Sequence, residues 1–192
     1  IVSEVSGEAA IDQSIFEKAL LIDIQTFGKS FLFLFKEFFL AIEINAVGNL
    51  LMNKQKKMPA TISFKFEENE LNFYNAETKI YKGKPTDHFN FKIDISKPEF
   101  DAAFVLSELQ KYSEDKIGVA LLNKNILAGI GNIIRTETLY HAKIHPDSLI
   151  KSIPEKKLIF LLKMIQDYAE EILTLLKTDS VEKNARKINH PF

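Results

Sequence analysis

The sequence predicts an α+β protein, an N-terminal antiparallel β-sandwich followed by an all-α domain. Short, aromatic-rich apolar runs separated by polar pairs fill the first half of the chain, which is typical of antiparallel strands. Apolar residues at helical spacing fill the second half. Between the halves, residues 82–98 are rich in turn and linker residues. We therefore expect two domains, 1–95 and 96–192.

The first half contains three apolar runs that indicate strands of a meander, at residues 20–27, 31–35 and 38–44. We expect Gly48 to break this pattern. Residues 61–66 and 71–74 then alternate between apolar and polar types about a turn at 67–70. This alternation predicts a hairpin with one face in water.

The second half predicts four helices, starting at Pro98, at Ile117 (to Leu122), at Asn132 (to Ala142) and at Pro154. The last is the longest, and one apolar stripe runs along it for about six turns. The stripe consists of Leu158, Leu161, Leu162, Ile165, Ala169, Ile172, Leu173 and Leu176.

Composition narrows the class of protein. The chain has 192 residues, 46% hydrophobic and 27% charged, as in ordinary globular proteins. It has no cysteine and only four histidines, so we expect no disulfide, no metal site and no cofactor. No apolar run has the roughly 18 residues of a membrane span, and the start lacks the features of a secretion signal. We expect a cytoplasmic monomer without a membrane partner.

Charge is distributed unevenly along the chain. The formal net charge is −1, yet residues 123–163 hold 7 Lys+Arg against 3 Asp+Glu, a local charge of +4. A local positive field attracts a phosphate backbone. A solvated helical face explains the same pattern, and charge alone leaves both interpretations open.

The segment 121–146 has the pattern of a short helix, an irregular link with two glycines, and a second helix. Gly129 and Gly131 permit positive φ and a close approach of the backbone to a ligand. Asn132 is expected at the N-cap, with free N–H groups beyond it, and such a helix start favours anions. Alternatively, the glycines only allow a tight turn and Asn132 only caps the helix.

The Gly-Ile-Gly-Asn core at 129–132 and the closing Ile-His-Pro at 144–146 resemble the helix-two-turn-helix element of the formamidopyrimidine-DNA glycosylase and endonuclease VIII family. The resemblance implies that Asn132 contacts a DNA phosphate next to the damaged nucleotide. Backbone amides of Gly129 and Gly131 would assist it.

Three further residues of this segment are candidates with a plain alternative. Arg135 and Lys143 would add phosphate contacts from the following helix, or would only solubilise the surface. His145, which precedes Pro146, is expected to shape the turn rather than to act as an acid or base.

The resemblance extends to the strand half. Residues 27–32 resemble the family's Gly-Lys hairpin, which makes Lys29 a candidate active-site lysine that contacts phosphate; a lysine facing water is the alternative. Residues 45–50 fall where the family has a histidine-led segment that includes a residue filling the space of the extruded base. Asn45 stands in place of that histidine.

Family members attack the sugar with an N-terminal proline followed by glutamate, and many end in a cysteine zinc ribbon. This sequence begins Ile1-Val2-Ser3-Glu4 and has no cysteine. Were the chain complete as written, we would expect DNA binding with little glycosylase turnover.

The sequence suggests three candidate functions for the protein. The first is damaged-DNA binding and base-excision repair by a protein like a DNA glycosylase and abasic-site lyase, acting on lesion-containing or abasic double-stranded DNA. The second is a catalytically inactive nucleic-acid-binding helix-two-turn-helix module. The third is an RNA-binding ribosomal protein, against which the strand domain and the near-neutral charge argue.

Overall fold

The computed structural model describes residues 1–177. It divides into two compact units, Ile1–Phe89 and Asn90–Phe192, and each is described by itself. The end of the predicted helical domain, residues 178–192, lies outside the described residues, as does the side chain of Leu176 in the predicted stripe.

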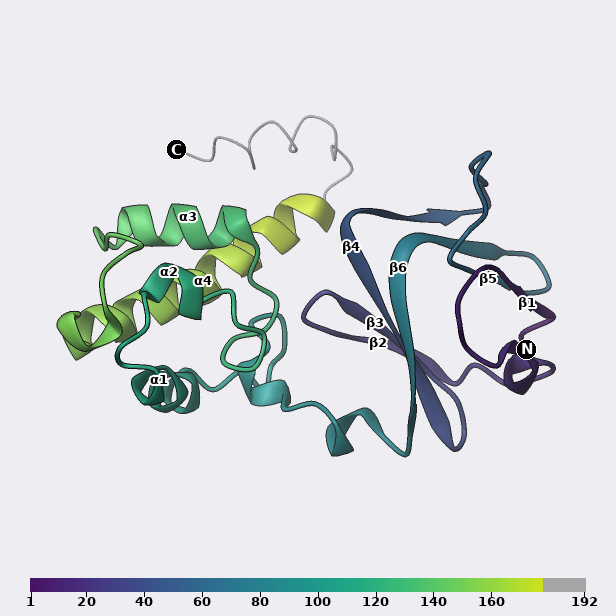
Figure 1. Ribbon diagram of the computed structural model, residues 1–192, viewed down its shortest axis with the longest axis horizontal. Coiled ribbons are helices and arrows are strands. Elements are labelled where there is room, and N and C mark those ends of the chain that lie inside the picture. The colour runs from purple at the N-terminus through teal and green to yellow at the C-terminus, as the bar shows by residue number, and fades with distance from the viewer. Residues whose placement is uncertain (178–192) are drawn as a thin grey trace. The chain divides into compact units, whose positions relative to one another are not determined.

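The first unit is a six-stranded antiparallel sheet in the order β1-β5-β6-β4-β3-β2 (Figure 1). Its strands are β1 (Glu4–Ser6), β2 (Asp23–Phe27), β3 (Ser30–Leu34), β4 (Phe38–Met52), β5 (Ile62–Lys65) and β6 (Glu70–Lys82), with a 3-10 turn, η1 (Gln13–Phe16), after β1. The predicted hairpin is confirmed as β5 and β6, whose turn closes where the Phe66 amide donates to the Asn69 carbonyl at 2.7 Å.

This sheet folds back on itself. Strands β3 and β5 have β4 and β6 between them, which in a flat sheet would separate them by about 14 Å at about 4.8 Å per strand. Yet the rings of Phe33 on β3 and Phe64 on β5 stack with centroids 5.0 Å apart. The two halves of the sheet therefore face each other, and the predicted sandwich is confirmed.

The fold occurs at a bulge in the long strands β4 and β6. Their register runs to Ile44↔Ala76 and resumes at Asn49↔Tyr74, so residues 45–48 face the single residue Asn75. We define residues 45–48 as the corner. Gly48 was expected to break the strand pattern, and it does lie in this bulge, where the register of β4 and β6 shifts, although β4 continues through it to Met52. A Cβ on Gly48 would lie 2.5 Å from the Asn75 carbonyl oxygen, so glycine permits the close approach of the two strands.

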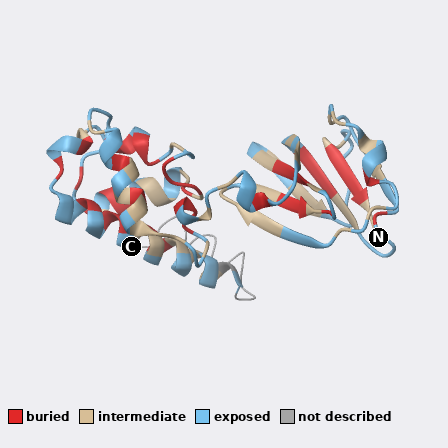
Figure 2. Cartoon of the chain, turned by 90° about the horizontal axis from the view of Figure 1, so that it is seen from below, coloured by how far each residue is buried: buried red, intermediate tan, exposed pale blue. Residues whose placement is uncertain are grey.

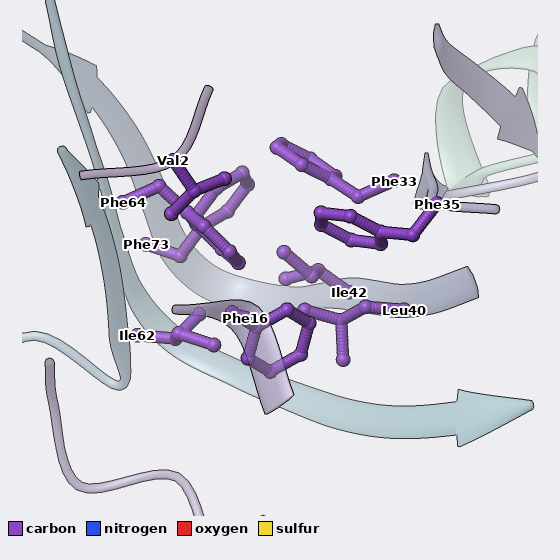
Figure 3. Close-up of a cluster of buried hydrophobic side chains, with 9 residues drawn as sticks. All are labelled: Val2, Phe16, Phe33, Phe35, Leu40, Ile42, Ile62, Phe64 and Phe73. Carbon is purple, nitrogen blue, oxygen red and sulfur yellow. The ribbon is translucent and has the colours of Figure 1, made fainter. Parts of the chain in front are cut away.

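The core of the unit lies between the two halves of the sheet and is dominated by phenylalanine. Figure 3 shows nine buried side chains pointing toward one another: Val2, Phe16, Phe33, Phe35, Leu40, Ile42, Ile62, Phe64 and Phe73. Phe16 comes from η1 and not from a strand, and its ring lies 5.7 Å from that of Phe64. Aromatic pairs at this distance add to the stabilisation from burial alone.

Up to residue 177, the second unit contains four α-helices: α1 (Ala102–Lys111), α2 (Ile117–Ala120), α3 (Asn132–His141) and α4 (Glu155–Lys177). Short 3-10 turns are η2 (Pro85–Asp87) in the first unit, and η3 (Phe91–Ile93) and η4 (Ile150–Ser152) in the second. Figure 2 shows buried residues within both units. Among residues 1–177, no helix is long and apolar enough to cross a membrane.

Two predicted helix boundaries are wrong by more than one residue. The first helix starts at Ala102 and not at Pro98, because the Asp101 carboxylate accepts the Phe104 amide at 3.0 Å and caps the helix there. The second ends at Ala120, two residues before the predicted Leu122.

Helix α4 buries the first four residues of the predicted stripe, from Leu158 to Ile165, but Leu173 is 46% exposed, so the stripe is shorter than predicted. Tyr168, absent from that prediction, is buried on the same helix. Burial and the nearby carboxylates of Glu137 and Glu171 raise the pKa of Tyr168. Since Glu137 lies on α3, the tyrosine belongs to the packing of α3 against α4.

Candidate nucleic-acid interface

Helix α3 begins at a glycine cap and not at an asparagine cap. Gly131 is the N-cap residue, with extended backbone at φ −117° and ψ 178° and no side-chain capping bond. The prediction of Asn132 at the N-cap is therefore wrong, and Asn132 is the first helical residue. The extended backbone at Gly131 moves the cap back by one position, so the Asn132 side chain is not used to cap the helix.

The start of α3 presents polar groups without partners. Asn132 is exposed, and no side-chain hydrogen bond of Asn132 occurs among residues 1–177. The first backbone bond of the helix runs from the Arg135 amide to the Gly131 carbonyl at 3.0 Å. The amides of residues 132–134 consequently have no acceptor within the helix. Free amides at a helix N-terminus, together with an exposed carboxamide, suit an anion such as phosphate.

The loop before α3 is fixed by the segment that leads into the second unit. Ala128 and residues 93–95 form a parallel bridge, in which the Ala128 amide donates to Ile93 at 2.8 Å and the Ile95 amide donates to Ala128 at 3.2 Å. Gly129 follows with φ +89°, and a Cβ there would lie 2.9 Å from Ile95 Cγ1. Only glycine meets both conditions without strain.

The linker prediction overlooked this support. Residues 82–98 were expected to contribute little to a core, but Ile93 and Ile95 are 5% and 4% exposed. Asp94 between them is fully buried, and its carboxylate accepts the amide and the hydroxyl of Ser96 at 3.0 and 2.8 Å. The only signal in the sequence is the pair of isoleucines flanking Asp94, which is too short to distinguish from a turn.

The other predicted phosphate contacts of this unit are Arg135 and Lys143, and a structural partner is seen for the Arg135 side chain. Arg135 is half-buried, and its guanidinium donates to the Gly118 carbonyl on α2 at 3.4 Å. Lys143 is exposed and takes φ +51° just after α3. That left-handed position commonly ends a helix. Their side chains remain candidates for phosphate contact.

The turn after α3 returns to the start of α2. The Gly118 amide donates to the Pro146 carbonyl at 2.9 Å, and the Lys116 ammonium lies 2.8 Å from the Asp147 carboxylate. The Lys116 ammonium holds the pKa of Asp147 below its usual value. His145 accepts the Asp147 amide at 3.2 Å, an interaction within the turn itself.

In the strand unit, Lys29 lies in the tight turn between β2 and β3. Gly28 takes φ +56° there, Phe27 pairs with Ser30, and Lys29 is exposed. Val47 at the corner is 80% exposed, which is unusual for a large apolar side chain. Lys29 and Asn132 belong to different units. The candidates around the α2–α3 loop lie together in the second unit, whereas Lys29 lies on the β2–β3 hairpin of the first.

The described residues 1–177 hold no group of three or more histidine, cysteine, aspartate or glutamate side chains placed to bind a metal ion.

Comparison with known proteins identifies the domain that contains this site. Residues 93–185 match the profile of the formamidopyrimidine-DNA glycosylase H2TH domain. The chain carries the H2TH domain of formamidopyrimidine-DNA glycosylases. The matched range covers the loop at Gly129, the start of α3 and the bridging segment around Asp94, so the site described above lies within this domain.

Sequence relatives extend the match into the strand unit. The chain is 23% identical over 164 residues to endonuclease 8-like 3 of Homo sapiens, covering 81% of this chain and 27% of that protein. It is 26% identical over 162 residues to formamidopyrimidine-DNA glycosylase of Cytobacillus firmus, covering 77% of this chain and 58% of the relative. The chain thus spans about a quarter of the human relative and just over half of the bacterial one.

Solved structures share the fold. Lactococcus lactis formamidopyrimidine-DNA glycosylase bound to DNA with an abasic site aligns with a TM-score of 0.78 at 19% identity, covering 96% of this chain and 78% of that one. A viral DNA glycosylase aligns with a TM-score of 0.74 at 19% identity, covering 93% and 78%. The predicted fold class, a β-sandwich followed by a helical helix-two-turn-helix domain, is confirmed.

Proposed function

We propose that this protein binds damaged or abasic double-stranded DNA and acts in base-excision repair, in the manner of a DNA glycosylase and abasic-site lyase. We also propose that the protein is located in the cytoplasm, as expected from the sequence. The match to a glycosylase domain supports it, and so do the names of the relatives, one of which was solved on DNA with an abasic site. Extruding a nucleotide costs the least free energy at a lesion, because base stacking is already weakened there.

One observation carries the proposal, namely the exposed start of α3, which has no side-chain capping bond. Among residues 1–177 the Asn132 carboxamide has no hydrogen-bond partner, and the amides of residues 132–134 have no acceptor within the helix. An asparagine with a purely structural role would instead cap the helix. A phosphate oxygen accepts from such groups with no need for a basic side chain. The rigid bridge at Ala128 holds the loop in this form before DNA arrives.

Lys29 is the candidate amine of the strand unit. In the proposed role its ammonium contacts phosphate, and as a free amine it condenses with the aldehyde of an abasic sugar, losing water to form an imine. The catalytically inactive binding module remains the second candidate. Borohydride distinguishes the lyase-like enzyme from the inactive module. It reduces an imine to a stable secondary amine, so it traps an imine-forming protein on abasic DNA and leaves an inactive module untrapped.

The test measures the affinity for a duplex containing a tetrahydrofuran abasic analogue, and for the intact duplex, by fluorescence anisotropy at one salt concentration. We expect the parent to prefer the abasic duplex. Asn132→Ala should weaken that binding about 10- to 100-fold, since a hydrogen bond to a charged group contributes about 1.5–3 kcal/mol. Thr136→Ala, an exposed polar position one turn along α3, is the matched control. An Asn132→Ala variant that binds the abasic duplex as tightly as the parent would overturn the proposal.

A further inference from the structure

The loop between β4 and β5 is strongly basic. Residues 44–66 contain Lys54, Lys56, Lys57 and Lys65 and no acidic residue, although the whole chain carries a net charge of −1. Residues 52–59 are all exposed, and Figure 1 shows this connection projecting beyond the strands of its unit. We define residues 52–59 as the basic loop.

Buried polar groups fix the backbone of the basic loop. Asn72 is 1% exposed and donates to the Lys54 carbonyl at 3.1 Å. Tyr74 is 2% exposed, and its hydroxyl accepts the Lys56 amide at 2.9 Å. Both residues lie on β6, so the loop is anchored twice to a central strand. A loop that is already ordered loses little conformational entropy when it binds a partner.

The lysines of this loop divide into one that faces the protein and two that do not. The Lys56 ammonium donates to Asn49 and lies 5.0 Å above the Tyr74 ring. Lys54 and Lys57 are exposed, and neither ammonium forms an ion pair with a described carboxylate. The nearby carboxylate of Glu70 instead accepts the Gln55 side chain at 2.8 Å. Two ammonium groups are therefore held at the surface without a counter-charge.

The basic loop lies beside the corner. Asn49, which Lys56 contacts, is the first residue after the corner to resume pairing with β6. This contact joins the basic loop to the end of the corner, in which the Val47 side chain is 80% exposed. Exposed apolar and positively charged side chains match the chemistry of DNA, in which base faces lie between phosphate rows.

We propose that Lys54 and Lys57 contact backbone phosphates of the DNA that the protein binds, as a second anchoring surface separate from the start of α3. This inference rests on the proposed function. The contact is independent of sequence, because an ammonium on a phosphate reads no base. Each phosphate neutralised in duplex DNA releases counterions and changes the slope of log K against log salt by about 0.9.

The test compares the salt dependence of binding for two doubly substituted variants with the same change in charge. Lys54→Gln/Lys57→Gln removes the proposed contacts and keeps the loop anchors, which use the backbone of Lys54 and Lys56. Lys36→Gln/Lys82→Gln is the matched control: both lysines are exposed, and they lie at the other end of β4, where Lys82 pairs with Phe38. Affinity for the abasic-analogue duplex is measured over a series of salt concentrations.

We expect the slope of the first variant to be smaller in magnitude by about 1.8, two contacts at about 0.9 each, and that of the control to change far less. Equal changes in both variants, or an unchanged slope in the first, would overturn the inference. The proposed function fails on different results: the parent shows no preference for the abasic duplex, or Asn132→Ala binds that duplex as tightly as the parent.

Discussion

The rings of Phe33 and Phe64 stack at 5.0 Å although two strands of the same sheet lie between theirs. This contact shows that the sheet turns over at the corner, where residues 45–48 of β4 face only Asn75 of β6. The aromatic core and the exposed corner are therefore consequences of one bulge. The surface that we propose for DNA is built on the strand that also closes the core.

Removing one ring of this pair should strongly destabilise the strand unit. Phe64 is fully buried, and we expect Phe64→Ala to lower the free energy of unfolding by about 3–5 kcal/mol through lost burial and the cavity left behind. Ile24→Ala on the edge strand β2, where the side chain is 44% exposed, should cost far less. Urea unfolding measures both, and similar losses for the two variants would contradict a folded-over core.

The two glycines before α3 should respond differently to alanine. Gly129 has φ +89° and contacts Ile95, whereas Gly131 has φ −117°, which any residue can adopt. We expect Gly129→Ala to destabilise the helical unit by at least about 1–2 kcal/mol, the cost of a left-handed backbone with a Cβ, and to exceed the effect of Gly131→Ala. Thermal unfolding of both variants checks the order, and the reverse order would exclude the described loop.

The Lys116–Asp147 ion pair predicts a specific acid sensitivity. Lys116 lowers the pKa of Asp147 from its ordinary 3.8, so the folded protein favours the carboxylate. The resulting stabilisation is present above pH 3.8 and is lost as the pH falls through the lowered folded-state value. The difference in stability between the parent and Asp147→Asn should vanish over that range.

Thermal melts at a series of pH values measure this difference, and NMR titration of the Asp147 carboxyl carbon measures the pKa directly. In Lys116→Gln the pKa should rise toward its ordinary value. A stability difference that stays constant down to the most acidic pH would show that the ion pair does not act as described.

Sequence patterns predicted the elements that depend on local periodicity. The alternation around residues 67–70 predicted the β5–β6 hairpin, and the stripe beginning at Leu158 predicted α4. Features set by contacts between distant residues were missed. Gly48 indicated a break because its close approach to Asn75, distant in sequence, is invisible in a local pattern. The start of α1 was missed for a local reason, because Asp101 competes with Pro98 as the initiating residue.

The candidate site was proposed from the order of its residues, and its geometry was not predicted. Gly129, Gly131 and Asn132 were identified from their order in the chain, yet the N-cap was placed one residue late. A cap depends on backbone dihedral angles, and Gly-Asn permits either residue to take that position. The support from Asp94 was missed because it comes from a segment more than 30 residues earlier, paired by a single bridge.

The central claim is that Asn132 donates a hydrogen bond to a DNA phosphate. The most direct test is a thermodynamic cycle that combines one change in the protein with one change in the DNA. The partner change is a neutral methylphosphonate in place of the phosphate next to the abasic analogue, and dissociation constants are measured for the four combinations of parent or Asn132→Ala with either duplex. We predict that the methylphosphonate weakens the parent about 10- to 100-fold and has little further effect on Asn132→Ala. Equal losses in both proteins at every phosphate near the lesion would contradict the claim.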